Sequence, residues 1–136
     1  MIPRLAAVRH IDVPTVRDPR GCLSVLEGGR QLPFQVARVF YMHGMTADRG
    51  GHAHPDTEQC VIAVAGSLRL DLTDGLASVS HVLDDPTRGL YVPPMVFIDI
   101  RDLSPDAVCL VLASTIYEPA RVIRTLAAYL EAAAAP

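Results

Sequence analysis

The chain carries little charge and has no cluster of basic residues. Of its 136 residues only 20% are charged, and the formal net charge is −3. Proteins that bind nucleic acids or anionic membranes carry a basic patch or stripe. We therefore expect no nucleic-acid or membrane partner, and any positively charged site must be local.

Long apolar runs are also absent. The longest stretches, such as Cys60 to Ala65 and Val108 to Ala113, end well short of the roughly 18 residues that span a bilayer. Met1 to Val8 do not contain the apolar stretch of about 7 to 15 residues that marks a signal peptide. We expect no membrane span, no signal peptide and a cytoplasmic location.

Cysteine is scarce, and no two cysteines form a CxxC pair. The three cysteines, Cys22, Cys60 and Cys109, are far apart and odd in number, and each lies in a hydrophobic segment. Disulfide frameworks and zinc sites need paired or clustered cysteines. Buried free thiols in a reducing cytosol are the simplest interpretation.

What the chain has in quantity is apolar material. Half of its residues are hydrophobic, which is enough to order the chain, so intrinsic disorder is excluded. A length of 136 residues fits one domain of ordinary size. We expect residues 1–136 to form a single domain.

The apolar segments are short, rich in Val, Ile and Leu, and separated by Gly, Pro and Asp, as β-strands are. The Asp74-Gly75 dipeptide favours a hairpin turn, and Pro93-Pro94 must end a strand. The predicted strands are 22–27, 34–42, 58–64, 67–72, 78–83, 89–92, 96–100 and 108–114. Eight short strands without intervening helices favour an antiparallel sandwich or barrel, and a jelly roll fits best.

One helix is expected, at the C-terminal end of the chain. From Arg121 onward, apolar residues recur at spacings of three to four, and four alanines follow. We predict a short α-helix over about 121–133, packed on the outside of the barrel.

Two of the five histidines lie close together in the segment Arg49-Gly-Gly-His-Ala-His54. If this segment is extended, residues i and i+2 point to the same side, so His52 and His54 enter one space. Glu58 would join them if the strand continued unbroken. The sequence therefore predicts that titratable groups converge here.

Two chemistries fit such a group. Two imidazoles and a carboxylate can bind a transition metal, which usually takes another imidazole from a later strand. The later segment 95–100 contains no histidine, and His81 follows the hairpin as a surface residue. We favour the second chemistry, in which the imidazoles transfer protons and no metal or other cofactor takes part.

The order of short motifs along the chain resembles that of the sugar nucleotide 3,4-ketoisomerases of the cupin superfamily. The motifs are Arg20-Gly21, Pro33-Phe34, Arg38-Val-Phe-Tyr41, Arg49-Gly-Gly-His-Ala-His54, Glu58-Gln59, Gly66-Ser67, Asp74-Gly75, Gly89-Leu-Tyr-Val-Pro-Pro94, Leu112-Ala-Ser114, Tyr117-Glu118 and Ile123-Arg124. The resemblance covers about residues 17–130.

The resemblance implies a double-stranded β-helix, the cupin form of the jelly roll. It also implies a homodimer, commonly with exchanged N-terminal strands, and activity without a metal. The implied reaction converts dTDP-4-keto-6-deoxyglucose to its 3-keto isomer on routes to amino-deoxysugars. A dTDP-linked 4-keto-6-deoxyhexose is the expected small-molecule partner.

The chain departs from this family at three places. After the double proline it has Phe97 and Ile98, where the family often has a Trp and a polar residue. The aromatic pair is Phe40-Tyr41 rather than two tyrosines, and the loop 42–48 looks about two residues short. We expect Phe97 still to form a wall of the pocket, whereas Ile98 cannot donate a hydrogen bond.

The candidate catalytic residues are His52, His54 and Tyr41. Moving a ketone to the neighbouring carbon requires removal of a proton beside the carbonyl, an enediol, and return of a proton to the former carbonyl carbon. We assign His52 as the carbon base and His54 as the group that moves protons between the two oxygens. Tyr41 is either an oxygen-side donor or a buried wall.

The candidate substrate-binding residues are Arg49, Arg20, Arg38, Glu58, Phe97 and Arg124. Arginine suits a diphosphate because its planar guanidinium presents several donors. Arg49 and Arg20 each adjoin a glycine, and Arg124 follows from the resemblance. Glu58 either orients an imidazole or pairs with an arginine.

Two other functions use the same scaffold. One is a metal-dependent cupin enzyme, and the other is a sugar-binding cupin without catalytic activity. The fold alone does not choose among the three. The paired histidines favour catalysis, and the missing histidine in the later strand disfavours the metal enzyme.

Overall fold

A computed structural model describes residues 4–135, so both ends of the expected 1–136 domain lie outside the described residues. The described residues form eleven strands, one α-helix and two short 3₁₀ turns. The strands are β1 (Arg9–Asp12), β2 (Thr15–Asp18), β3 (Gly21–Ser24), β4 (Arg38–Met42), β5 (Arg49–His52), β6 (Gln59–Ala65), β7 (Leu68–Thr73), β8 (Ser78–Leu83), β9 (Arg88–Val92), β10 (Phe97–Arg101) and β11 (Val108–Ala113). The turns are η1 (Arg4–Ala7) and η2 (Pro119–Arg121), and the helix is α1 (Leu126–Ala134).

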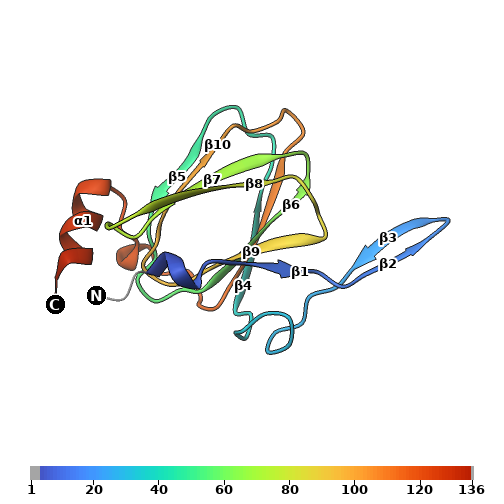
Figure 1. Ribbon diagram of the computed structural model, residues 1–136, viewed down its shortest axis with the longest axis horizontal. Coiled ribbons are helices and arrows are strands. Elements are labelled where there is room, and N and C mark those ends of the chain that lie inside the picture. Colours follow the sequence, from blue (N-terminus) through green and yellow to red (C-terminus); the bar gives the residue numbers. More distant parts are fainter. Residues whose placement is uncertain (1–3, 136) are drawn as a thin grey trace.

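Two antiparallel sheets face each other and enclose the centre of the molecule (Figure 1). Within the described residues, one sheet has the order β1-β9-β6-β11-β4 and the other has the order β5-β10-β7-β8. From β4 to β11 the chain alternates between the two sheets in the manner of a jelly roll, except that the hairpin strands β7 and β8 lie in the same sheet. The predicted all-β jelly roll is confirmed.

The main core lies between the two sheets. Along β7, Leu68, Leu70 and Leu72 point inward and are buried, whereas the residues between them are half-exposed. A second buried cluster covers the other face of the five-stranded sheet and includes Leu32, Phe34 and Ile62. Strand β6 is therefore buried on both faces, as its continuous apolar sequence indicates.

The predicted hairpin at Asp74-Gly75 joins β7 to β8. The Asp74 carboxylate is buried and accepts hydrogen bonds of 2.9 Å from the backbone N–H groups of Leu76 and Ala77. Gly75 has a φ of +89°, in the region that favours glycine. The turn is built from residues 74–77 because Thr73 pairs with Ser78.

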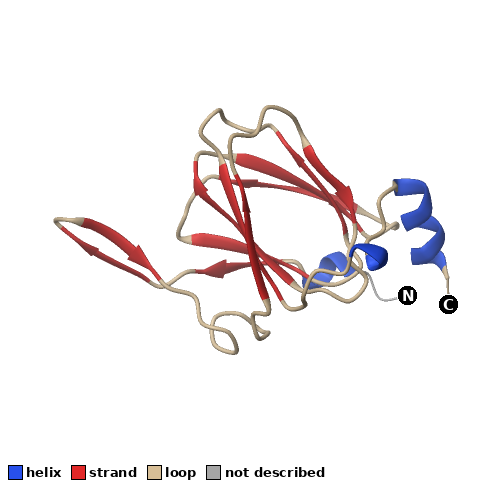
Figure 2. Cartoon of the chain, turned by 180° about the vertical axis from the view of Figure 1, so that it is seen from behind, coloured by secondary structure: helices blue, strands red, loops and turns tan. Residues whose placement is uncertain are grey.

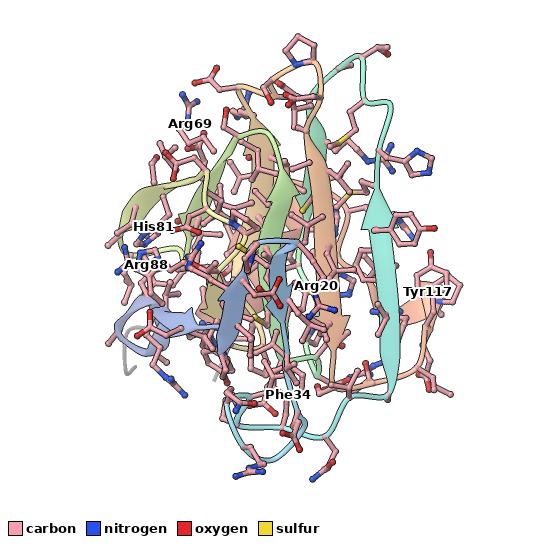
Figure 3. All side chains as sticks on the ribbon, turned by 90° about the vertical axis from the view of Figure 1, so that its right-hand side faces the viewer. Arg20, Phe34, Arg69, His81, Arg88 and Tyr117 are labelled. Carbon is pink, nitrogen blue, oxygen red and sulfur yellow. The ribbon has the colours of Figure 1, made fainter. Side chains whose placement is uncertain are left out.

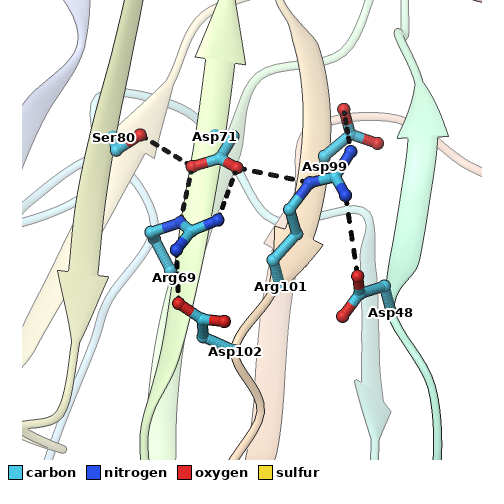
Figure 4. A network of polar contacts seen from close by, with 7 residues as sticks. All are labelled: Asp48, Arg69, Asp71, Ser80, Asp99, Arg101 and Asp102. Carbon is cyan, nitrogen blue, oxygen red and sulfur yellow. Dashed lines mark hydrogen bonds and ion pairs between the residues drawn. The ribbon is translucent and has the colours of Figure 1, made fainter.

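Charged residues cover the outer face of the four-stranded sheet, where Asp71 is the centre of a network (Figure 4). Its carboxylate lies 2.9 Å from Arg69 Nε and 3.3 Å from Arg101 Nε. Arg101 also reaches Asp99 on its own strand and Asp48 in the loop before β5. Each exposed pair contributes little to stability, but together the pairs connect that loop to the sheet.

Strands β1, β2 and β5 lie outside the predicted set. Strand β1 pairs with β9 at an edge, and β5 pairs with β10. Strands β2 and β3 form a separate hairpin that projects from the barrel (Figures 1 and 2). Two expectations were wrong. Residues 34–37, predicted as the start of a strand, form a loop before β4. Cys22, expected to be a buried thiol, is exposed on β3, whereas Cys60 and Cys109 are buried as expected.

The C-terminal helix begins at Leu126 rather than at 121, which corrects the prediction. Thr125 caps it by accepting a hydrogen bond of 3.1 Å from the Ala128 N–H. Before the cap the chain is extended, because Ile123 pairs with Ala53 through two backbone hydrogen bonds. Among residues 4–135, no helix has the length and apolar character needed to cross a membrane.

Helix α1 packs on the outside of the barrel, at the end opposite the β2–β3 hairpin (Figure 2). Its buried residues Tyr129 and Ala133 contact Ala53 and Phe97. The Tyr129 hydroxyl donates a hydrogen bond of 2.8 Å to the Met95 carbonyl. One aromatic side chain thus anchors the helix.

We expect Tyr129→Ala to lower the free energy of unfolding by about 3 to 5 kcal/mol, because it leaves a cavity and unpaired carbonyls. Leu130→Ala, one residue further and exposed, is the matched control and should cost less than about 1 kcal/mol. Urea unfolding followed by circular dichroism measures both. Equal losses in the two variants would contradict the anchoring role of Tyr129.

Candidate active site

His52 and His54 lie together near the end of the barrel that α1 covers. His52 is the last residue of β5, and Ala53 then pairs with Ile123. The two imidazole rings meet edge to face, with centroids 4.9 Å apart. The structure thus brings both rings into one space, as their spacing predicts.

A bulge in β5 sets the direction of His52. In the pairing with β10, His52 lies opposite Ile98 and Gly50 lies opposite Asp99, so Gly51 is the extra residue. Gly50 has a φ of +91°, and a Cβ atom there would lie 2.7 Å from the Ile98 carbonyl oxygen. Only glycine fits at this position, and bulges of this kind redirect the side chains beside them.

Two cavities share His52, Phe40 and Arg124 in their linings. The barrel cavity, of about 410 Å³, lies between the sheets. Its apolar lining consists of Phe40, Met42, Val61, Leu70, Ile98, Ile100 and Val111, and its polar lining consists of Asp48, Arg49, His52, Gln59 and Arg124, besides Gly50. The mouth pocket, of about 400 Å³, is lined by Arg38, Val39, Phe40, His52, His54, Tyr117, Val122 and Arg124.

Two guanidinium groups line the mouth pocket. That of Arg38 lies 5.3 Å from the centre of the Phe40 ring and 5.2 Å from that of Tyr117. That of Arg124 donates a hydrogen bond of 3.3 Å to the Tyr117 hydroxyl. Tyr117, which lies beside β4 (Figure 3), therefore positions both cations.

The His54 side chain is held neutral. Burial lowers its pKa to about 4, and the charges of His52, Arg38 and Arg124 contribute in the same direction. Its Nε2 atom is buried and has no hydrogen-bond partner among residues 4–135. At pH 7 the ring therefore offers one N–H donor and one free lone pair.

Tyr41 lies outside both cavities, which corrects its predicted position. Tyr41 is not among the residues that line the barrel cavity or the mouth pocket. Tyr41 is exposed, and its ring lies 5.5 Å from that of His43. It is neither a donor in this pocket nor a buried wall.

Glu58 and Phe97 also lie elsewhere than predicted. The chain turns at residues 55–56, so Glu58 does not continue the histidine strand; its carboxylate accepts a hydrogen bond of 2.7 Å from the Tyr91 hydroxyl. Phe97 packs against Tyr129 under the helix. The inward residue of β10 is Ile98, which lines the barrel cavity.

The remaining predicted arginines are separated. Arg49 is exposed and lines the barrel cavity, whereas Arg38 and Arg124 line the mouth pocket. Arg20 lies on the β2–β3 hairpin (Figure 3), with its side chain 90% exposed and paired with Asp18 at 2.7 Å. In this chain Arg20 therefore does not reach the histidines.

The sequence alone indicated no function for two residues that line the site, Tyr117 and Gln59. Tyr117 was part of a motif, but nothing in the sequence indicated that it would lie between two arginines. Gln59 lines the barrel cavity, and an alternation of Gln59, Val61 and Ala63 on one face of β6 could have revealed it. Among residues 4–135, no three His, Cys, Asp or Glu side chains are grouped so that they could hold a metal ion.

Comparison with known proteins finds relatives over nearly the whole chain. The family model FdtA, described as WxcM-like, C-terminal, matches residues 6–134. A TDP-4-oxo-6-deoxy-alpha-D-glucose-3,4-oxoisomerase from Aneurinibacillus thermoaerophilus is 38% identical over 116 residues, which make up 84% of this chain and 84% of that protein.

Solved structures agree with this match. A 3,4-ketoisomerase from Helicobacter canadensis superimposes with a TM-score of 0.90 and 31% identity, covering 93% of this chain and 97% of that one. A mutant of the 3,4-ketoisomerase QdtA from Thermoanaerobacterium thermosaccharolyticum, in complex with TDP-4-keto-6-deoxyglucose, has a TM-score of 0.89 and 31% identity, covering 93% of each chain.

Because the pKa of His54 is lowered in the folded state, we expect His54 to make the folded protein less stable at acidic pH. Unfolded histidine titrates near pH 6.5, so between about pH 6.5 and 4 the unfolded state binds more protons at His54 than the folded state does. Folding stability should therefore fall as the pH drops through this window. His54→Gln should lose less stability than the wild type between pH 7 and pH 4.

Thermal melts across this pH range measure the effect. The matched control is His43→Gln, at an exposed position outside the cavities, which should follow the wild type. The carboxylates also affect stability in this pH range, but they are the same in every variant, so the difference between variants reports the titration of His54. Identical pH profiles for the wild type and His54→Gln would show that burial does not depress this titration.

Proposed function

The chain belongs to the FdtA family, described as WxcM-like, C-terminal, and from this premise we propose that it is a 3,4-ketoisomerase that converts dTDP-4-keto-6-deoxyglucose to its 3-keto isomer. The observation that carries the proposal is the position of His52 at the junction of two cavities. The mouth pocket offers cations and aromatic rings, and the barrel cavity combines apolar side chains from both sheets with polar groups such as His52 and Gln59.

The two cavities suit the two parts of such a substrate. Arg38 and Arg124 would bind the diphosphate in the mouth pocket, where Phe40 and Tyr117 offer aromatic surfaces. The sugar would enter the barrel cavity beside His52. Its 6-deoxy carbon is a methyl group, which matches the apolar wall formed by residues such as Ile98 and Val61.

His52 acts as the carbon base in this proposal. It removes the proton from C3 of the sugar, the C–H electron pair forms a C3–C4 double bond, and the ketone electrons move to the C4 oxygen. The C3 hydroxyl then loses its proton, and C4 gains one, which leaves the ketone at C3. The reaction needs no external oxidant or reductant, and a placed base accelerates it about 10²- to 10⁴-fold.

His54 moves protons between the two oxygens. Because its pKa is lowered to about 4, the ring is neutral at pH 7 and can donate through one nitrogen and accept through the other. The proposed reaction uses no metal. A carboxylate that could join the histidines as a ligand, Glu58, hydrogen-bonds Tyr91 instead.

Metal-stripped wild-type protein, incubated with dTDP-4-keto-6-deoxyglucose in deuterated water, should give the 3-keto product with deuterium at C4, observed by NMR. His52→Asn should lower the rate by at least about 10²-fold, because the base is removed at little change in volume. The affinity of this variant for dTDP should stay within twofold of the wild type, as measured by calorimetry.

The matched control is His43→Asn, at an exposed position outside both cavities, which should turn over at the wild-type rate. Wild-type turnover in His52→Asn would show that another group is the base. Loss of turnover on removal of a stoichiometric metal would favour a metal-dependent cupin enzyme. Binding without turnover would favour a sugar-binding cupin.

The position of the arginines predicts which of them binds the diphosphate. Arg124→Ala should weaken dTDP binding about 10- to 100-fold, since a hydrogen bond to a charged group contributes about 1.5 to 3 kcal/mol. Arg49 was the first candidate from the sequence, but it lines only the barrel cavity, so Arg49→Ala should weaken dTDP binding less.

Calorimetric titration with dTDP compares these variants. Arg30→Ala, at an exposed site where Arg30 pairs with Glu27, is the control and should bind as the wild type does. If Arg49→Ala lost more affinity than Arg124→Ala, the diphosphate site would lie at the barrel cavity.

We also propose a cytoplasmic homodimer in which the β2–β3 hairpin packs against a second copy. Val16 and Leu23 on this hairpin are 63% and 60% exposed, and the hairpin projects beyond the barrel (Figure 1). Apolar residues in such positions gain stability when a partner covers them. Arg20 would then act on the partner rather than on its own histidines.

Light scattering at micromolar concentration should give the mass of a dimer. Val16→Arg combined with Leu23→Glu should shift the protein to the monomer. Val82→Glu replaces an equally exposed valine on β8 and should leave the dimer intact. A wild-type monomer would exclude this assembly.

A further inference from the structure

Gln59 is a polar residue enclosed in the barrel without a partner. It is the first residue of β6, and its backbone pairs with Val92 and Ala113. Its side chain lines the barrel cavity and the residue is only 4% exposed. Among residues 4–135, no side chain or backbone group forms a hydrogen bond with its amide.

An amide in this position favours a polar occupant of the cavity. The group has two N–H donors and a carbonyl acceptor, and with no protein partner among the described residues they are free to bind whatever occupies the cavity. Its neighbours Phe40, Val61 and Ile98 have no polar side-chain atoms. The only side chains in the lining that could compete for it are charged groups and His52.

The register of the strands shows where along the barrel Gln59 lies. Ala113 of β11 pairs with Gln59 on one side and with Arg38 of β4 on the other. Gln59 is therefore level with Arg38, which lines the mouth pocket, and it shares the barrel cavity with His52. A sugar that presents its reacting carbons to His52 would lie within this end of the cavity.

We propose that Gln59 binds the reacting ketone of the sugar, with its Nε2 group donating a hydrogen bond to the carbonyl oxygen. This inference rests on the proposed function. Negative charge develops on that oxygen when His52 removes the neighbouring proton, and a fixed donor stabilises it most at that moment. Gln59 thereby supplies the oxygen-side donor that was expected from Tyr41, which lies outside the cavity.

Gln59→Met tests the donor while keeping the length of the side chain. We expect kcat to fall about 10²- to 10³-fold, as loss of a donor to a developing oxyanion does. The affinity for dTDP should stay within twofold, because dTDP lacks the sugar. The melting temperature should be nearly unchanged, because the Gln59 amide makes no hydrogen bond to the rest of the described protein and Met has a similar volume.

Gln59→Glu adds a readout that a structural role would not produce. The ionised carboxylate cannot donate and should be nearly inactive at pH 8, whereas the protonated carboxyl can donate. Its kcat relative to that of the wild type should therefore rise as the pH falls toward 5. Gln35→Met, at an exposed site outside the cavities, is the matched control and should behave as the wild type.

The outcomes separate this inference from the proposed function. If the wild type binds dTDP but does not isomerise the sugar, the proposed function fails. If the wild type is active and Gln59→Met keeps kcat within threefold, the role of Gln59 is wrong. It is also wrong if Gln59→Met loses stability and dTDP binding together with activity, or if Gln59→Glu gains nothing at low pH.

Discussion

The pairing of β5 with β10 is the constraint on which the site depends. Gly51 is the extra residue in this pairing, and Gly50 approaches β10 too closely for any side chain. His52 follows at once, opposite Ile98, and so faces the junction of the two cavities. A regular strand of the same sequence would shift the histidines by one residue and turn them to the other face of the sheet.

The C-terminal segment holds the same strand from outside. Ile123 forms two backbone hydrogen bonds with Ala53, which lies between the histidines, and this brings the next residue, Arg124, to both cavities. Tyr129 then packs over Ala53 and Phe97. The helix therefore has a role beyond covering the barrel, because it holds in register the segment that supplies a cation to the site.

The sequence predicted the fold and the paired histidines, and the resemblance to cupin-type sugar nucleotide 3,4-ketoisomerases is confirmed. It failed where both faces of a strand are buried. Phe97 faces α1 and Ile98 faces the cavity, so both are apolar and their pattern does not distinguish inside from outside. Glu58 was misplaced because the turn after His54 breaks the alternation, and the helix start was missed because Thr125 takes the cap.

Two buried polar atoms without hydrogen-bond partners among residues 4–135 lie beside the two cavities. Within the described residues, Arg38 Nε and His54 Nε2 are buried without hydrogen-bond partners at this end of the barrel, as is His10 Nδ1 on β1, and Gln59 lines the barrel cavity beside them. Each such group costs the fold about 1 to 3 kcal/mol, whereas leucine or valine at the same positions would extend the core. A sequence selected for stability alone would not retain two of them beside the same pocket. Their joint presence indicates that this end of the barrel is shaped for an occupant that carries hydrogen-bonding groups, and that the fold bears the cost until it binds.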